Sequence, residues 1–181
     1  MGKFILILGG ARSGKSIYAV ELAKDFKKRV GFIATCTFLD KEMRERIKKH
    51  QRLRPRHWKL IEEGKEITTV LVNLQGKYDV VLVDCLGLWI SNLLADNLED
   101  KEIEKKIKEL LSVISRIEIT TILVSNEVGS GVVPDNLLAR RFGDLAGLAN
   151  QMLAKQADKV IFMQAGIPQI IKGGNTDAKI G

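Results

Sequence analysis

The sequence has 181 residues, with 29 lysines and arginines against 22 aspartates and glutamates, which gives a formal charge of +7. This length suits one domain with a real hydrophobic core, and 45% hydrophobic with 28% charged residues exclude a disordered or collagen-like chain. No apolar run approaches the ~18 residues of a membrane span, and two isolated cysteines indicate neither a disulfide framework nor a metal site, which favours the cytoplasm.

Apolar runs alternate with amphipathic segments along the chain. The runs predict buried strands at 3–8, 29–35, 78–84, 119–125 and 158–164, with shorter strands at 58–62 and 167–172. The segments between them predict helices at 16–26, 39–52, 66–74, 86–95, 102–117 and 134–155, the last with Pro134 in its first turn. This alternation predicts an α/β fold, with a mostly parallel sheet covered by helices on both faces. We expect one domain over residues 1–172, followed by a polar tail at 173–181.

The strongest motif follows the first strand and matches G-x-x-x-x-G-K-[ST]. It comprises Gly9, Gly10, Ala11, Arg12, Ser13, Gly14, Lys15 and Ser16. Glycines let backbone N–H groups wrap around phosphate oxygens, and the helix that follows adds the partial positive charge of its N-terminus. Lys15 is expected to reach the β- and γ-phosphates, and the Ser16 hydroxyl to bind Mg²⁺. The motif predicts a site for a nucleoside triphosphate with Mg²⁺.

Asp84 ends the apolar strand 80–83, where the second carboxylate of a phosphate-loop enzyme holds the Mg²⁺ shell. Residues 84–87 also fit D-x-x-G, so a GTPase switch is an alternative. Against it, the segment 125–128 reads SNEV where a GTPase would carry N-K-x-D to recognise guanine.

The positive charge is concentrated in residues 40–59. This segment holds nine basic and three acidic residues together with both histidines, so the rest of the chain is nearly neutral. No base-stacking aromatic cluster or DNA-binding motif accompanies it, so we expect no nucleic-acid partner. Nearby cations favour a neutral imidazole at His50, which could attack the α-phosphate and expel pyrophosphate. A solvated basic helix face is the alternative.

Four segments together resemble a known enzyme family: 9–16 (GGARSGKS), 46–55 (RIKKHQRLRP), 84–94 (DCLGLWISNLL) and 125–134 (SNEVGSGVVP). The chain is similar to the bifunctional adenosylcobinamide kinase / adenosylcobinamide-phosphate guanylyltransferases of cobalamin biosynthesis, over about residues 3–172. The resemblance implies a RecA-like phosphate-loop fold, a homotrimer and two reactions. In the first, ATP or GTP phosphorylates the aminopropanol hydroxyl of adenosylcobinamide. In the second, GMP passes from GTP to that phosphate, giving adenosylcobinamide-GDP and pyrophosphate.

The resemblance also implies roles for particular residues. The guanylylated histidine of the family falls on His50, so the expected catalytic residues are His50, Lys15 and Asp84. Ser16 and Asp84 are the expected ligands of Mg²⁺. Nucleotide contacts fall on residues 9–16 and on Ala34, Thr35, Cys36, Gln51, Arg52, Leu53, Arg54, Glu62 and Asp84. A carboxylate at Glu62 would suit guanine, because it can accept hydrogen bonds from N1–H and the exocyclic amine.

Two other functions stay open from the residues alone. A single-function phosphate-loop kinase would phosphorylate another small alcohol and use the basic segment as a lid. A GTPase-type nucleotide-binding module would hydrolyse GTP without any acceptor.

Overall fold

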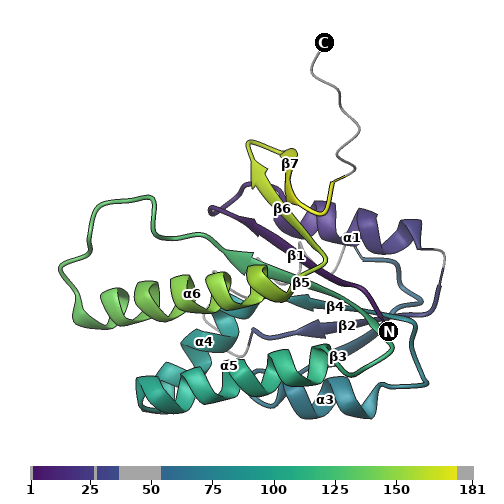
Figure 1. Ribbon diagram of the computed structural model, residues 1–181, viewed down its shortest axis with the longest axis horizontal. Helices are drawn as coiled ribbons and strands as arrows, with labels where there is room; N and C mark the ends of the chain where they lie inside the picture. Colours follow the sequence, from purple (N-terminus) through teal and green to yellow (C-terminus); the bar gives the residue numbers. More distant parts are fainter. Residues whose placement is uncertain (1, 27, 37–53, 175–181) are drawn as a thin grey trace.

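The computed structural model describes residues 2–26, 28–36 and 54–174. Its centre is a seven-stranded sheet in the order β3-β2-β4-β5-β1-β6-β7 (Figure 1). Every neighbouring pair is parallel except β6 with β7. The strands are β1 Phe4–Gly9, β2 Val30–Ala34, β3 Lys59–Glu62, β4 Val80–Asp84, β5 Thr120–Asn126, β6 Lys159–Gln164 and β7 Ile167–Lys172.

Helices cover both faces of this sheet (Figure 1). They are α1 Lys15–Asp25, α3 Ile67–Asn73, α4 Leu86–Ala95, α5 Asp100–Ile114 and α6 Leu137–Gln156. Of the described helices, α1 is the one that packs on one face, against side chains such as Ile7 and Leu82. The other four helices pack on the opposite face, over side chains such as Leu6 and Val83. Strand residues therefore alternate between two cores, which explains why the central strands read as continuous apolar runs.

The predicted α/β fold is confirmed, and the predicted strands and helices recur within the described residues with small shifts at their ends. The long helix that was expected from Pro134 begins instead at Leu137, so Pro134 is not in its first turn. The reason is the N-cap: the side-chain oxygen of Asn136 accepts a hydrogen bond from the backbone N–H of Ala139 at 3.1 Å. The helix that was expected over 39–52 lies outside the described residues. The boundary between domain and tail at residue 173 stays a prediction.

No helix among the described residues is long and apolar enough to cross a membrane.

Candidate active site

The phosphate loop lies where β1 ends and α1 begins. Gly14 has φ 94°, in the left-handed region that glycine adopts without strain, and it forms the N-cap of α1. A side chain at Gly9 would lie 2.5 Å from the carbonyl oxygen of Met163 on β6, so the loop passes too close to its neighbour for a Cβ. The motif's glycines thus serve the path of this loop, whose backbone leads into the positive end of α1.

Lys15 is the first residue of α1 and is only 7% exposed. Its ammonium donates a hydrogen bond to the carbonyl oxygen of Gly10 at 2.6 Å, which holds the side chain against the loop. Burial lowers the pKa of Lys15, and the charges of Cys85 and Asp84 oppose that effect. A desolvated cation beside a loop of backbone N–H groups suits a phosphate group, whose negative charge would compensate the burial.

The turn between β6 and β7 supports the loop from the far side. The backbone N–H of Gly166 donates to the carbonyl oxygen of Ser13 at 3.1 Å, and a Cβ on Gly14 would lie 3.3 Å from the Gly166 Cα. The Ser13 hydroxyl is buried and has no partner in the structure. Such a buried polar atom is costly unless something binds it, and it lies inside the loop, 2.7 Å from where a Cβ on Gly9 would stand. Sequence reasoning missed this hairpin support, because nothing in residues 163–166 marks a contact with the loop.

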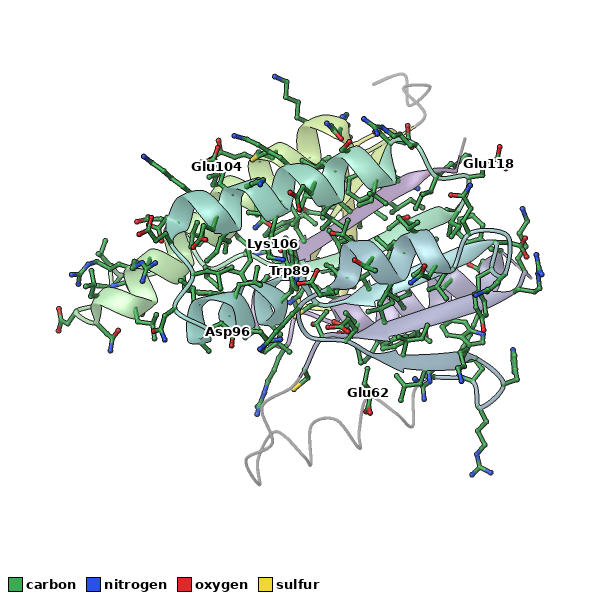
Figure 2. All side chains as sticks on the ribbon, turned by 90° about the horizontal axis from the view of Figure 1, so that it is seen from below. Glu62, Trp89, Asp96, Glu104, Lys106 and Glu118 are labelled. Atoms are coloured by element: carbon green, nitrogen blue, oxygen red, sulfur yellow. The ribbon has the colours of Figure 1, made fainter. Side chains whose placement is uncertain are left out.

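Three strands bring candidate residues into one row. Ala34 at the end of β2 pairs in register with Glu62 of β3 on one side and with Asp84 of β4 on the other. Residues paired in this way share a face of the sheet, and Ala34 packs on the α1 face. With strands about 4.8 Å apart, the backbones of Glu62 and Asp84 stand about 10 Å apart. The row thus leads from Asp84, whose charge acts on Lys15, to the exposed carboxylate of Glu62, which is labelled in Figure 2.

Ser16 and Asp84 fit the expected Mg²⁺ site in chemistry. Ser16 lies in the first turn of α1, Asp84 ends β4, and both are half-buried. The charge of Asp84 acts on the neighbouring Lys15, so the carboxylate lies close to the phosphate loop. A hydroxyl and a carboxylate oxygen are the hard ligands that Mg²⁺ takes beside phosphate oxygens. These two residues would hold the ion, with substrate phosphates and water as its other ligands.

Arg54 lies close enough to Glu62 for the charge of Glu62 to act on it. Both residues are expected nucleotide contacts. Its guanidinium carbon stands 5.3 Å from the centre of the Phe32 ring, a cation–π arrangement. Burial lowers the pKa of Arg54, and the charge of Glu62 opposes that effect. Its Nε–H is buried without a hydrogen-bond partner, so Arg54 offers a donor at the Glu62 end of the row.

Thr35 and Cys85 form a buried junction behind this row. The Thr35 hydroxyl donates to the carbonyl oxygen of Cys85 at 2.7 Å and accepts from the Cys85 backbone N–H at 2.8 Å. Thr35 is 0% exposed, its N–H donates to the Asp84 carbonyl oxygen and its own carbonyl accepts from Asn92, so it supports the site from inside the protein. Burial, with the charge of Asp84 as a second cause, raises the pKa of the Cys85 thiol to about 12. Cys36, which follows, is half-buried.

Asn92 and Trp89, both on α4, contact the loop after β3, and sequence reasoning missed both. The Asn92 amide nitrogen donates to the carbonyl oxygens of Thr35 and Gly64, and the Trp89 indole donates to that of Lys65. In the sequence they lie in an apolar helix, and no spacing signal marks them.

The remaining candidates divide by position. The expected nucleophile His50 and the contacts Gln51, Arg52 and Leu53 lie outside the described residues. A hollow at the opposite, amino edge of β2 and β4 is lined by residues that include Lys28, His57 and Tyr78, and by none of the candidates. The described candidates are instead gathered along the carboxyl edge, where ligands bind in open α/β sheets.

Comparison with known proteins gives a consistent result. Residues 5–171 match the family model described as cobinamide kinase / cobinamide phosphate guanyltransferase. The bifunctional adenosylcobalamin biosynthesis protein CobP of Pseudomonas aeruginosa is 41% identical over 168 residues, covering 93% of this chain and 96% of that protein. The bifunctional adenosylcobalamin biosynthesis protein CobU of Escherichia coli is 38% identical over 180 residues, covering 93% and 99%.

Solved structures share the fold at low identity. The flagellar accessory protein FlaH of Methanocaldococcus jannaschii has a TM-score of 0.57 at 14% identity, covering 94% of this chain and 78% of that one. A type III secretion system ATPase from pathogenic bacteria has a TM-score of 0.60, also at 14% identity, covering 94% and 57%. These likenesses support the phosphate-loop fold alone.

Proposed function

Because the chain belongs to the cobinamide kinase / cobinamide phosphate guanyltransferase family, we propose that one nucleotide site on the carboxyl edge of its sheet serves both activities of the family. The enzyme acts in cobalamin biosynthesis, first as a kinase on adenosylcobinamide and then as a guanylyltransferase on the phosphate formed. The observation that carries the single site is the row Glu62–Ala34–Asp84, in register beside the phosphate loop. It offers room for the base at one end and for the phosphates at the other.

The kinase step needs little covalent help from the protein. The backbone around Gly14 and the Lys15 ammonium hold the β- and γ-phosphates, so that the γ-phosphorus faces the aminopropanol hydroxyl in line with its leaving oxygen. The hydroxyl oxygen bonds to the γ-phosphorus, the bond to the β-phosphate oxygen breaks with its electrons going to the departing nucleoside diphosphate, and the hydroxyl proton passes to solvent. Positioning and neutralisation of charge supply most of the rate.

The guanylyl step needs a nucleophile, and we assign it to His50. A neutral imidazole nitrogen attacks the α-phosphorus of GTP, and pyrophosphate leaves with the electrons of the broken P–O bond. A phosphate oxygen of the acceptor then attacks the same phosphorus and releases the histidine. Glu62 would select guanine by accepting from N1–H and the exocyclic amine, with Arg54 beside it.

Ser16 and Asp84 would hold Mg²⁺ in this site. When bound, the ion neutralises phosphate charge and orients the phosphate oxygens. Lys15 would add a second positive charge at the phosphates, which explains why the chain keeps an amine in a desolvated place.

The remaining proposals follow the resemblance: a homotrimer, a cytoplasmic location and no nucleic-acid partner. The trimer is supported by exposed apolar side chains on the edge strand β7, where Ile167 is 64% and Ile171 is 61% exposed. Such residues commonly mark an interface between chains.

The test uses GTP labelled at the α-phosphate and the two histidines of the chain. The wild-type protein should retain acid-labile label after denaturation. The His50→Ala variant should retain none, while it still transfers the γ-phosphate to adenosylcobinamide. His57→Ala is the matched control, because His57 is exposed and should label normally.

Two results would contradict the division of roles. No adduct in the wild-type protein would favour a single-function kinase. Equal loss of both activities in a folded His50→Ala variant would show that His50 is needed for both steps, and would contradict its assignment as the nucleophile of GMP transfer only.

A further inference from the structure

We infer that Asn92 is a positioning residue for the nucleotide base: it ties together the loops that follow β2 and β3 and thereby fixes Glu62 relative to the phosphate loop. The inference rests on the proposed function, in which Glu62 recognises guanine.

The contacts of Asn92 are specific. The residue lies on α4 and is 2% exposed, among inward-facing apolar neighbours such as Ile90 and Leu93. Its amide nitrogen donates to the carbonyl oxygen of Thr35 at 2.7 Å and to that of Gly64 at 2.8 Å. An amide NH₂ has two protons, so one side chain serves both carbonyls. A buried amide in an apolar helix is costly unless it is paired, and this one is paired across two loops.

The position of this bridge explains its use. Strands β2 and β3 are paired in register up to Ala34 and Glu62, and the Glu63 N–H still donates to the Ala34 carbonyl oxygen at 3.0 Å. Just beyond, at Thr35 and Gly64, the Asn92 amide connects the two segments instead. Asn92 therefore holds the two loops together at the point where the hydrogen bonds between β2 and β3 end, at the edge of the sheet where we place the nucleotide.

The bridge continues toward the phosphates through Thr35. The Thr35 hydroxyl is bonded to both the N–H and the carbonyl of Cys85, the residue after Asp84. The series Gly64–Asn92–Thr35–Cys85 thus joins the loop that follows Glu62 to the residue that follows Asp84. All of its side chains are at most 8% exposed, so solvent does little to replace a lost bond.

Trp89 ties α4 to the same loop a second time. One turn before Asn92, its indole N–H donates to the Lys65 carbonyl oxygen at 2.7 Å, and the ring is 1% exposed. In Figure 2 Trp89 lies inside the protein, whereas Glu62 points away from the sheet. A rigid interior therefore supports an exposed carboxylate, as a base-recognition residue requires.

The experiment compares Asn92→Leu with Asn150→Leu. Asn150 is a matched control: it is a 6% exposed amide on α6 that accepts from Ser125 Oγ at 2.6 Å and donates to the Asn126 carbonyl at 3.0 Å. It supports the end of β5 and not the loop after β3. Both substitutions put an apolar side chain of similar size in place of a buried amide.

The measured quantities are dissociation constants for GTP and ATP analogues with an α,β-methylene bridge, which bind without transferring GMP. Asn92→Leu should lower the preference for the GTP analogue by about tenfold, as expected when one charge-assisted hydrogen bond to the base is weakened. Its affinity for the ATP analogue should change by less than about twofold, because the phosphate loop is untouched. Asn150→Leu should lower the melting temperature about as much as Asn92→Leu does, but it should keep the wild-type preference for the GTP analogue.

An unchanged preference in a folded Asn92→Leu protein overturns the inference, as does an equal loss of preference in Asn150→Leu. If Asn92→Leu does not fold, Asn92→Ser is measured under the same criteria, since the smaller side chain lets water reach the two carbonyls.

Glu62→Gln, measured in parallel, separates this inference from the proposed function. If Glu62→Gln loses the preference and Asn92→Leu keeps it, the inference fails and the assignment of Glu62 stands. If Asn92→Leu loses the preference and Glu62→Gln keeps it, Asn92 positions the base site through another residue and the assignment of Glu62 fails. If Asn92 acts through Glu62, both single variants should lose the preference for the GTP analogue. The double variant should then lose no more of this preference than Glu62→Gln alone.

Discussion

The phosphate loop and the Glu62 end of β3 lie on one edge of one sheet, yet different interactions hold them in place. The loop is shaped largely by its own residues, through Gly14 at φ 94° and the bond from the Lys15 side chain to Gly10, with one bond from the β6–β7 turn. The Glu62 end is held from outside, by bonds that α4 donates to the carbonyls of Gly64 and Lys65. In the proposed site the phosphates would therefore meet structure that a motif largely encodes, whereas the position of the base would depend on tertiary packing.

The largest expected effect lies at the phosphate end. Lys15→Ala should slow both phosphorylation and GMP transfer by about 10³-fold, because both reactions use the same triphosphate cradle and lose a charge that stabilises the transition state. Initial rates with γ- and α-labelled nucleotide measure the two reactions. A variant that transferred GMP at the normal rate would require a second nucleotide site, so the phosphate loop would not serve both reactions.

Loss of the Lys15 ammonium should not have the same harmful effect on folding. Burial lowers the pKa of Lys15, so the unfolded chain binds its proton more tightly than the folded one does. This difference in proton binding makes the free energy of unfolding rise with pH between the pKa of Lys15 in the folded protein and its ordinary value of 10.5. In Lys15→Met, thermal unfolding without nucleotide should show a melting temperature no lower than that of the wild type, and a flatter pH dependence in that window. A marked fall in melting temperature would mean that the ammonium stabilises the empty loop.

A smaller effect is expected where α4 holds the base end. Trp89→Phe removes the bond to the Lys65 carbonyl and some packing volume, and should lower the free energy of unfolding by about 1–2 kcal/mol. Denaturant titration gives the stability, and binding of the GTP analogue should weaken more than binding of the ATP analogue. Trp58→Phe, the same change in the chain's other tryptophan, should destabilise without that selectivity. Equal weakening of both analogues in Trp89→Phe would show that the two ends are not held separately.

The smallest effect concerns the junction between the two ends. Burial keeps the Cys85 thiol protonated to about pH 12, whereas in the unfolded chain it ionises near 9.0. The folded state therefore retains a proton that the unfolded state loses, and stability falls as pH rises above 9. Between pH 9 and 10 this amounts to about 1 kcal/mol. When the free energy of unfolding is measured against pH, Cys85→Ala should reduce its fall above pH 9. Cys36→Ala, which removes the half-buried thiol, is the control and should leave that fall unchanged.

Sequence reasoning succeeded where structure is local. Continuous apolar strands, helical periodicity and the glycine motif predicted the fold and the position of the loop, because each depends on residues close together in the chain. The start of α6 was misplaced at Pro134, since a proline and the Asn136 cap both mark helix beginnings and only the side-chain bond distinguishes them.

The base end could not be predicted in the same way. Glu62 came from the resemblance, and its alignment with Asp84 depends on the register of three strands whose order in the sheet, β3-β2-β4, differs from their order in the sequence. Asn92 looks like an ordinary polar residue in an apolar helix, and only its two bonds distinguish it. Long-range hydrogen bonds of this kind leave no periodic signal in a single sequence.

The number of nucleotides bound per chain tests the account most directly. Equilibrium dialysis with the methylene-bridged GTP analogue should give one site per chain, and the ATP analogue should displace all of it, because both occupy the same phosphate loop. Two independent sites, or a bound GTP analogue that saturating ATP analogue does not displace, would contradict a single nucleotide site for both reactions.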